Sequence, residues 1–283
     1  MTDPRSEYEA YVGREERLDE DITLFPVQGL RALLDEREPE LDKGDPLPPF
    51  WQYLYFLPRA PQSKIGSDGH PERGGFLPPV TLPRRMFAGG RQRFLQPLII
   101  GKPASRVGTI LSVSEKHGQS GSLVFVTVRY RFLQDDQVCV EEEQDIVYRG
   151  AGGRVPAPVP ADPLPPLPDD AFSRMVTPDP VLLFRFSALS FNAHRIHIDR
   201  TYAMEEEGYP GLVVHGPLTA ILLLDLCRRN IDRPVASFSF RGKAPLFDLA
   251  PFRLAGVQDG DKVALEAHGP DGKTAMTVDV ELG

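Results

Sequence analysis

The chain has 283 residues, a net charge of −8, and hydrophobic and charged fractions of 41% and 25%, which are ordinary for a globular protein. No apolar run approaches the roughly eighteen residues of a membrane-spanning helix. The acidic balance argues against a general nucleic-acid binder, which would present a basic face. The two cysteines, Cys139 and Cys227, have no metal or redox spacing and cannot form a disulfide framework.

The beginning of the chain, MTDPRSEYEA, does not combine the basic start and apolar stretch of a secretory signal, so we expect a cytoplasmic protein. Further along, an aromatic, apolar segment at 49–57 is interpreted as a short buried helix whose aromatic side chains belong to the core. A loop rich in glycine and proline follows at 58–82, and we expect it to cover part of the molecule. Strands are predicted at 104–115, 122–133 and 137–148.

Prolines mark a boundary in the middle of the chain. Seven of the thirteen residues from 156 to 168 are proline, and this density favours extended chain without regular structure. We therefore expect residues 151–170 to link an N-terminal domain, 1–150, to a C-terminal domain, 171–283.

The C-terminal half predicts one helix among strands. The apolar segment at 181–191 is interpreted as a strand. Residues 217–229 predict a helix, because Pro217 suits a first helical position and the segment is apolar almost all round, as in a helix buried on every side. One buried helix followed by antiparallel strands predicts an α+β fold with a curved sheet around a central helix. Those strands are predicted at 235–243, 252–257, 262–268 and 274–282.

Polar side chains gather directly after the segment at 181–191 and at the start of the buried helix. Loops at the ends of regular elements often carry functional sites. The spacing of these histidines is not the His-Glu-x-x-His of zinc enzymes, so no metal is expected. The candidate residues are Asn192, His194, Arg195, His197, Asp199, His215 and Gly216.

The stretch FSALSFNAHRIHIDR that contains most of them resembles the hydratase motif of the MaoC-like enoyl-CoA hydratases of the hot-dog superfamily. The resemblance places His197 on the family's catalytic histidine and Gly216 on the glycine that begins the central helix. Asn192 stands where the family has its catalytic aspartate, and His194 where it has asparagine. Asp199 matches the acid that follows the histidine.

The form FNAHRIHID, together with LPRRMFAGGR upstream, is similar to one branch of two-domain proteins of this length. That branch comprises the mesaconyl-C4-CoA (3-methylfumaryl-CoA) hydratases and the type 2 3-hydroxyacyl-thioester dehydratases. The resemblance implies two hot-dog domains with a degenerate N-terminal one that shapes the groove. It also implies catalysis by the C-terminal half, an acyl-CoA thioester substrate, no metal or redox cofactor, and a homodimer.

Hydration of an unsaturated thioester needs a base for water, a proton for Cα and stabilisation of the thioester oxygen. We expect His197 to carry the proton, since imidazole titrates near neutral pH. We expect the amide of Gly216, at a helix N-terminus, to stabilise the oxygen. Asn192 would hold the water, because an amide cannot act as a base. His194 or Asp199 could assist, although an acid at 199 fits better as a helix cap or as a partner that orients a histidine.

Four functions stay open at this point. The favoured one is reversible hydration of a short, branched dicarboxylic thioester, and the next is dehydration of 3-hydroxyacyl thioesters in fatty-acid synthesis. A thioesterase would need a carboxylate to activate water, which Asn192 does not supply, and a non-catalytic acyl-CoA-binding protein would need neither histidine nor oxyanion donor. Candidates for binding the substrate, including its anionic groups, are Arg84, Arg85, Arg91, Arg195, His215, Arg241 and Lys243.

Overall fold

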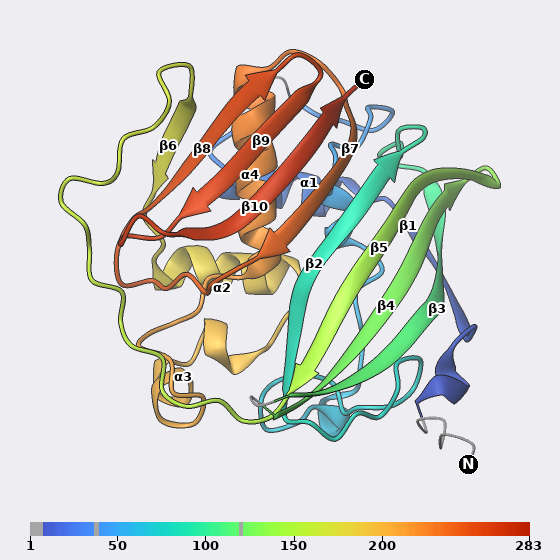
Figure 1. Cartoon of the computed structure of the whole chain (residues 1–283). Helices are drawn as coiled ribbons and strands as arrows, with labels where there is room; N and C mark the ends of the chain where they lie inside the picture. Colours follow the sequence, from blue (N-terminus) through green and yellow to red (C-terminus); the bar gives the residue numbers. More distant parts are fainter. Residues whose placement is uncertain (1–7, 37–39, 119–120) are drawn as a thin grey trace.

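In the computed structural model, which describes residues 8–36, 40–118 and 121–283, ten strands pair into one antiparallel sheet (Figure 1). The strands are β1 (Glu15–Asp21), β2 (Arg84–Phe94), β3 (Pro103–Gly118), β4 (Gly121–Gln134), β5 (Gln137–Arg149), β6 (Phe172–Val176), β7 (Val235–Gly242), β8 (Phe252–Asp259), β9 (Lys262–His268) and β10 (Thr274–Leu282). Their order across the sheet is β1-β3-β4-β5-β2-β7-β10-β9-β8-β6. The strands predicted from the sequence are therefore confirmed as β3 to β5 and β7 to β10.

The helices are α1 (Leu24–Leu33), α2 (Pro180–Leu189), α3 (Arg200–Glu205) and α4 (Gly216–Asn230). The long helix α4 confirms the predicted buried helix, because all its residues from Leu218 to Cys227 are buried. It packs against β6, β8, β9 and β10, and Figure 1 shows these strands curving around it. An apolar surface on every side of a helix is satisfied only by such an enclosure.

The two halves of the sheet meet where β2 pairs with β7. Residues 89–93 of β2 are antiparallel to residues 237–241 of β7. Two glycines permit this close approach, since a Cβ on Gly89 would lie 2.6 Å from the carbonyl oxygen of Phe240, and one on Gly90 would lie 3.0 Å from the Phe240 ring. The sequence did not predict β2, because glycine and arginine weaken a strand pattern.

The predicted strand at 181–191 is wrong, since most of that segment forms the helix α2. The Asp179 carboxylate accepts a hydrogen bond from the backbone of the first turn, and Pro180 occupies a first-turn position. Phe186 is buried while Phe184 is exposed, so one face of the helix packs and the other does not. A continuous apolar run hides helical periodicity, whereas the capping residues were the signal that identifies a helix here.

The predicted helix at 49–57 shrinks to a single 3-10 turn at Trp51–Leu54. Phe50 and Phe56 have positive φ angles of 71° and 55°, which end the turn on both sides. Both aromatic rings are nevertheless almost fully buried, so their assignment to the core is confirmed. The helix α1 and the strands β1 and β6 were not predicted.

Residues 150–171 form neither helix nor strand and run along the outer side of the C-terminal half in Figure 1. Backbone hydrogen bonds tie this stretch to the C-terminal half, from Val155 to Gly208 and from Ala161 to Pro270, each 2.8 Å long. Their role as a linker between two domains stays a prediction. None of the described helices is long and apolar enough to cross a membrane.

The loop at 58–82 leaves the N-terminal half and docks on the segment that carries the motif. The amide of Arg195 donates to the carbonyl of Asp68 at 2.9 Å. Gly69 has a φ of +89°, and a Cβ there would lie 1.9 Å from the carbonyl oxygen of Ala193. Only glycine allows this contact, so the loop is fixed to the motif at residue 69.

Replacing Gly69 by alanine should therefore release the loop. Gly75→Ala is the matched control, because Gly75 has a φ of +78° but its Cβ would meet nothing within 4 Å. The control carries only the left-handed backbone cost of about 1–2 kcal/mol, whereas Gly69→Ala adds a clash with backbone. We expect faster limited proteolysis within 58–82 only for Gly69→Ala. Equal proteolysis of the two variants would mean that this contact does not hold the loop.

Candidate active site

A pocket of about 1480 Å³ lies between the two halves of the chain. It is lined by the loop at 58–82, by β2 and β5, and by α2, the motif segment and the start of α4. Ordinary small-molecule pockets measure about 300–1,000 Å³, so this one suits an elongated ligand. The motif thus opens into a groove built by both halves.

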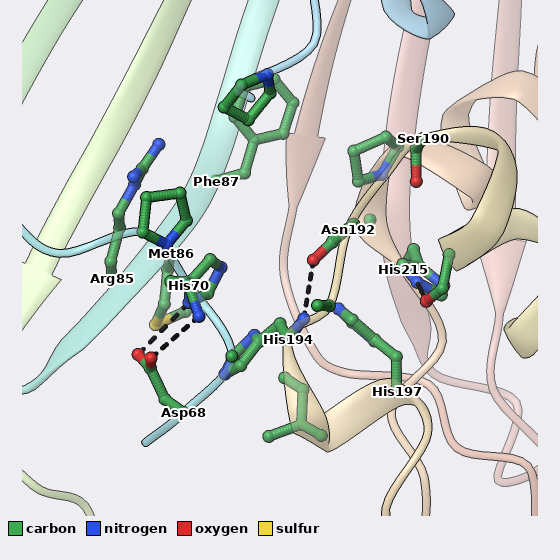
Figure 2. Close-up of a pocket in the computed structure, with 18 of the residues that line it drawn as sticks. Asp68, His70, Arg85, Met86, Phe87, Ser190, Asn192, His194, His197 and His215 are labelled. Atoms are coloured by element: carbon green, nitrogen blue, oxygen red, sulfur yellow. Dashed lines mark hydrogen bonds and ion pairs between the residues drawn. The ribbon is translucent and has the colours of Figure 1, made fainter. Parts of the chain in front are cut away.

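Four of the six histidines of the chain follow one another across this pocket (Figure 2). The ring centroids of His70 and His194 are 4.1 Å apart, those of His194 and His197 are 5.5 Å apart, and those of His197 and His215 are 3.6 Å apart. The structure therefore brings the three motif histidines together and adds His70 from the opposite half.

His197 is held in one tautomer. Its Nδ1 lies 2.7 Å from the carbonyl oxygen of Val213, and because a carbonyl only accepts, Nδ1 must carry the proton. The lone pair is then on Nε2. Burial lowers the pKa of His197 well below its ordinary value, and the neighbouring His215 acts in the same direction. His197 is thus a neutral imidazole with a free basic nitrogen at neutral pH.

The ring of His215 stacks on the ring of His197. Its Nε2 lies 2.9 Å from the hydroxyl of Ser187, and its buried Nδ1 has no hydrogen-bond partner within the described chain. Burial lowers its pKa to about 3, so the ring stays uncharged. His215 therefore packs against His197 and positions it.

Gly216 begins α4 immediately after His215. A Cβ on Gly216 would meet nothing within 4 Å, so the space in front of it is open pocket. The first amides of a helix have no partner inside the helix and carry positive partial charge. An oxygen that enters the pocket can approach this backbone closely.

Asn192 lines the pocket, and its side-chain oxygen accepts a hydrogen bond of 3.0 Å from the amide of His194. The oxygen is thereby committed to the turn, which leaves the amide nitrogen for a bound molecule. His194 lines the pocket too, and its Nε2 lies 3.9 Å from Glu207. The sequence-based assignment of both residues to the site is consistent with this placement.

Three further candidate residues are Asp199, Arg195 and Arg241. Asp199 caps α3 and forms an ion pair with Arg195 at 2.7 Å, and it does not line the pocket. Arg195 lines the pocket and also donates to the carbonyl of Ser67. Arg241 is exposed and lies outside the pocket. The prediction that an acid at 199 fits a helix cap is confirmed, and contact of Arg195 and Arg241 with substrate stays a prediction.

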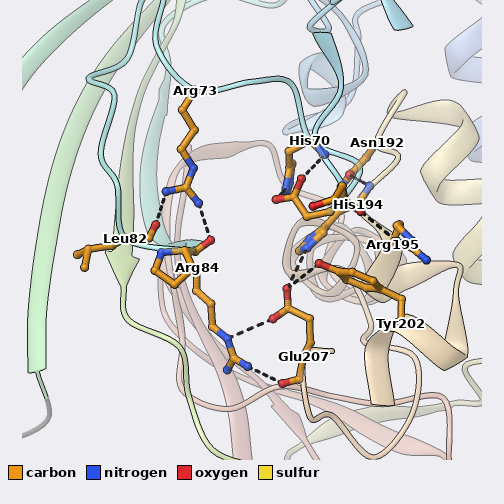
Figure 3. A network of polar contacts seen from close by, with 12 residues as sticks. His70, Arg73, Leu82, Arg84, Asn192, His194, Arg195, Tyr202 and Glu207 are labelled. Carbon is orange, nitrogen blue, oxygen red and sulfur yellow. Dashed lines mark hydrogen bonds and ion pairs between the residues drawn. The ribbon is translucent and has the colours of Figure 1, made fainter. Parts of the chain in front are cut away.

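Two carboxylates that the sequence did not indicate flank the histidines, Asp68 (Figure 2) and Glu207 (Figure 3). Asp68 lies 3.3 Å from Nδ1 of His70, and Glu207 lies between His194 and Arg84, with Arg84 at 3.2 Å. His194 and then Arg84 hold the pKa of Glu207 below its usual value, against the effect of burial. The sequence signal that could have identified Asp68 and His70 is the tripeptide Asp-Gly-His, in which glycine allows the chain to reverse.

The cationic side chains of the groove divide into paired and unpaired ones. Arg84 pairs with Glu207, and Arg91 pairs with Glu143 and Asp145 outside the pocket. Within the described part of the chain, no ion pair is formed by the pocket-lining cations Arg85, Arg149 and Lys243. Unpaired cations in a groove attract an anionic ligand.

The residues that could hold a metal ion are Asp68, His70 and His194. One ligand atom from each lies within 4.8 Å of the other two. The hydrogen bond between Asp68 and His70 orients two of these three side chains.

Comparisons with known proteins identify the family. The model of the family described as hydroxyacyl-thioester dehydratase type 2 matches residues 50–248. The chain belongs to this family. It is 57% identical to the mesaconyl-C4-CoA hydratase of Chloroflexus aurantiacus over 98% of this chain and 99% of that protein. It is 27% identical to the mitochondrial type 2 hydroxyacyl-thioester dehydratase of Schizosaccharomyces pombe, over 86% of this chain and 90% of that one.

The expected double hot-dog fold is confirmed by comparison with a solved structure. A Mycobacterium tuberculosis protein with a double hot-dog fold has a TM-score of 0.60 and 12% identity over 96% of each chain. The two curved halves of the sheet are therefore two hot dogs, as the motif implied. Family membership makes the chain a MaoC-like hydro-lyase and speaks against a thioesterase or a non-catalytic binding protein.

The buried histidines predict a stability that depends on pH. The folded pKa values of His197 and His215 are lowered, so below about pH 6.5 the unfolded chain binds protons that the folded chain excludes. The free energy of unfolding should be highest above that pH and fall by up to about 1.4 kcal/mol per pH unit for each histidine below it. Urea unfolding at several pH values tests this. His215→Phe should make the slope shallower, and an identical slope in that variant would contradict the assignment.

Proposed function

We propose that this chain reversibly adds water to the double bond of a short, branched dicarboxylic enoyl-CoA such as mesaconyl-C4-CoA. The observation that carries the proposal is the adjacency of a base and an oxyanion donor. His197 exposes a basic Nε2, its ring stacks on His215 at 3.6 Å, and the open backbone of Gly216 follows directly. The relative with 57% identity hydrates a thioester of this class by its name.

The chemistry assigns one task to each group. Nε2 of His197 takes a proton from water, and the hydroxide oxygen bonds to Cβ. The electron pair of the double bond moves toward the thioester oxygen, which the amide of Gly216 stabilises as it becomes negative. The side-chain nitrogen of Asn192 holds the water, because its oxygen is committed to the turn. A proton then bonds to Cα.

The dicarboxylic preference rests on charge. Arg85, Arg149 and Lys243 line the groove without acidic partners among the described residues, so the groove can hold a free carboxylate in addition to the phosphates of CoA. The second candidate, dehydration of longer 3-hydroxyacyl thioesters, is favoured by the exposed rings of Phe184 and Phe191, which also line the pocket. These rings would contact an extended neutral acyl chain.

Four further points belong to the same proposal. The reaction uses no metal or redox cofactor, the protein acts in the cytoplasm as a homodimer, and residues 151–170 connect the two hot dogs, 1–150 and 171–283. The written reaction supports the absence of a redox cofactor, because it moves only protons and one electron pair within the substrate. The proline density of the connecting stretch supports the last.

A panel of enoyl-CoA esters tests the function. The ultraviolet absorbance of the enoyl thioester and the release of free thiol are followed with mesaconyl-C4-CoA, crotonyl-CoA and trans-2-octenoyl-CoA. We expect loss of enoyl absorbance without thiol release, and the highest kcat/KM with mesaconyl-C4-CoA. Highest activity with octenoyl-CoA would favour the fatty-acid dehydratase, and thiol release would identify a thioesterase.

Gly216→Val should lower kcat by about two to three decades, because the new side chain keeps the thioester oxygen away from the backbone amide. Gly216→Ala should have a smaller effect. Since a Cβ at this position meets no protein atom within 4 Å, the thermal unfolding midpoint of both variants should stay near that of the parent. Parental turnover in a folded Gly216→Val protein would place the oxyanion site elsewhere.

A further inference from the structure

The hydration reaction moves two protons, and the motif provides one basic group with a fixed free lone pair. Water must lose a proton near Cβ, and Cα must gain one. In this chain Asn192 stands where the MaoC-like hydratase motif has aspartate, and its side-chain amide cannot exchange a proton. His197 would therefore have to carry out both proton transfers, from water near Cβ and to Cα, unless another group in the pocket carries out the second one.

His70 is placed to be that group. It comes from the loop at 58–82, lines the pocket, and lies with its ring against His194 at a centroid distance of 4.1 Å. The loop is fixed there by the amide of Arg195, which donates to Asp68, and by the contact of Gly69 with Ala193. Figure 2 shows His70 facing the motif histidines from the side of the opposite half.

Asp68 fixes the tautomer of His70. One carboxylate oxygen accepts from the backbone amide of His70 at 2.9 Å, and the other lies 3.3 Å from its Nδ1. Burial raises the pKa of Asp68, but the hydrogen bonds from His70 outweigh it and keep the group ionised. An ionised carboxylate only accepts, so Nδ1 of His70 carries a proton and Nε2 is the nitrogen that exchanges one.

We propose that His70 is a second catalytic residue, which exchanges the proton at Cα, and that Asp68 is the residue that positions it. The proposal rests on the hydratase function and assigns its second proton transfer to the N-terminal half. In hydration, His197 takes a proton from water, the hydroxide bonds to Cβ, and the electron pair moves to the thioester oxygen. The enolate then takes, at Cα, the Nε2 proton of His70 in its doubly protonated, cationic form, which leaves His70 neutral and His197 protonated.

The charges around the two histidines favour this division. The charged and titratable groups that face His70 are Asp68 on its own loop, His194 in the motif segment and Arg85 on β2. Burial, His194 and Arg85 together lower the pKa of His70, although Asp68 opposes this shift. Burial lowers the pKa of His197 well below its ordinary value, where only the Val213 carbonyl opposes the shift. Of the two rings, His70 therefore holds a proton more readily, and hydration uses the protonated form of His70.

His194 completes the cycle. Its ring contacts both His70 and His197, so after each turnover it can carry the proton back from His197 to His70. Glu207 lies 3.9 Å from its Nε2 and is itself held by Arg84, so a carboxylate lies beside the His194 ring.

The test compares His70→Gln, Asp68→Asn and His197→Ala, with His268→Gln as the control. His268 is also paired to a carboxylate, Glu266 at 2.8 Å, but lies outside the pocket. His70→Gln should lower kcat by about two decades or more, Asp68→Asn should lower it less, and KM should change little in both. The control should keep the parental kcat. Thermal unfolding midpoints show whether each variant is folded.

Hydrogen–deuterium exchange at Cα of the hydrated product, followed by mass spectrometry in D₂O, separates the two proton transfers. His197→Ala should still exchange the Cα hydrogen although it no longer forms the enoyl ester, whereas His70→Gln should lose this exchange. Exchange that survives in His70→Gln and disappears in His197→Ala would overturn the proposal, as would parental kcat in a folded His70→Gln. If neither variant exchanges the Cα hydrogen, the pH profile of kcat/KM in Asp68→Asn decides.

In Asp68→Asn the pKa of His70 falls, because the anion that raises it is gone. Hydration requires protonated His70, so the basic limb of the pH profile of kcat/KM should move to lower pH, and a limb that stays in place overturns the proposal.

A metal requirement is a separate outcome. Loss of the activity of the parent protein in EDTA, with recovery on adding Zn²⁺, would also overturn the proposal, since Asp68 and His70 would then be metal ligands. Lack of activity of the parent protein on mesaconyl-C4-CoA, with hydration of another enoyl-CoA, would concern the proposed substrate only, and the variants are then compared on that other ester.

Discussion

The pairing of β2 with β7 is the constraint on which the rest of the molecule depends. It joins two half-sheets into one and places the concave side of the N-terminal half next to the start of α4. Because Gly89 and Gly90 bring the strands together without side chains between them, the halves cannot slide apart without losing backbone hydrogen bonds. A loop from one half can then reach the motif of the other and stay there.

Electrostatics in the groove follow from this enclosure. Burial keeps His197 and His215 uncharged, while carboxylates from two different segments hold His70 and His194. The four rings therefore form one row but have different partners, with carboxylates beside His70 and His194 and neutral groups beside His197 and His215. A row of identical side chains can divide acid and base work in this way only if the surroundings of each ring differ.

The sequence predicted the buried helix and seven strands, because their apolar patterns are long and their ends carry glycine, aspartate or proline. It also placed His197, Gly216 and Asn192 at one site. It failed where local signals conflict with tertiary contacts. The segment 181–191 is apolar on both sides, so its helical period is hidden, and β2 is a strand only because β5 and β7 flank it.

The site residues that the sequence analysis missed on the loop at 58–82 lie far from the motif in the sequence. Asp68 and His70 lie more than a hundred residues before the motif, and their Asp-Gly-His sequence indicates a turn but does not indicate which residues it contacts. Asp199 shows the opposite case, since it lies inside the motif but caps α3, pairs with Arg195 and does not line the pocket. Proximity to a motif in sequence therefore identifies the segment, but not which of its side chains line the pocket.

The turn at Asn192 has a consequence for how such enzymes diverge. Its side-chain oxygen accepts from the amide of His194, and an aspartate has an oxygen at the same position that accepts the same bond. Exchange between the two residues leaves the loop geometry intact and changes only the charge next to His197. One substitution can therefore convert the carboxylate form of the motif into the amide form, and the protein stays folded. The activity is kept provided that another group in the pocket replaces the lost proton carrier.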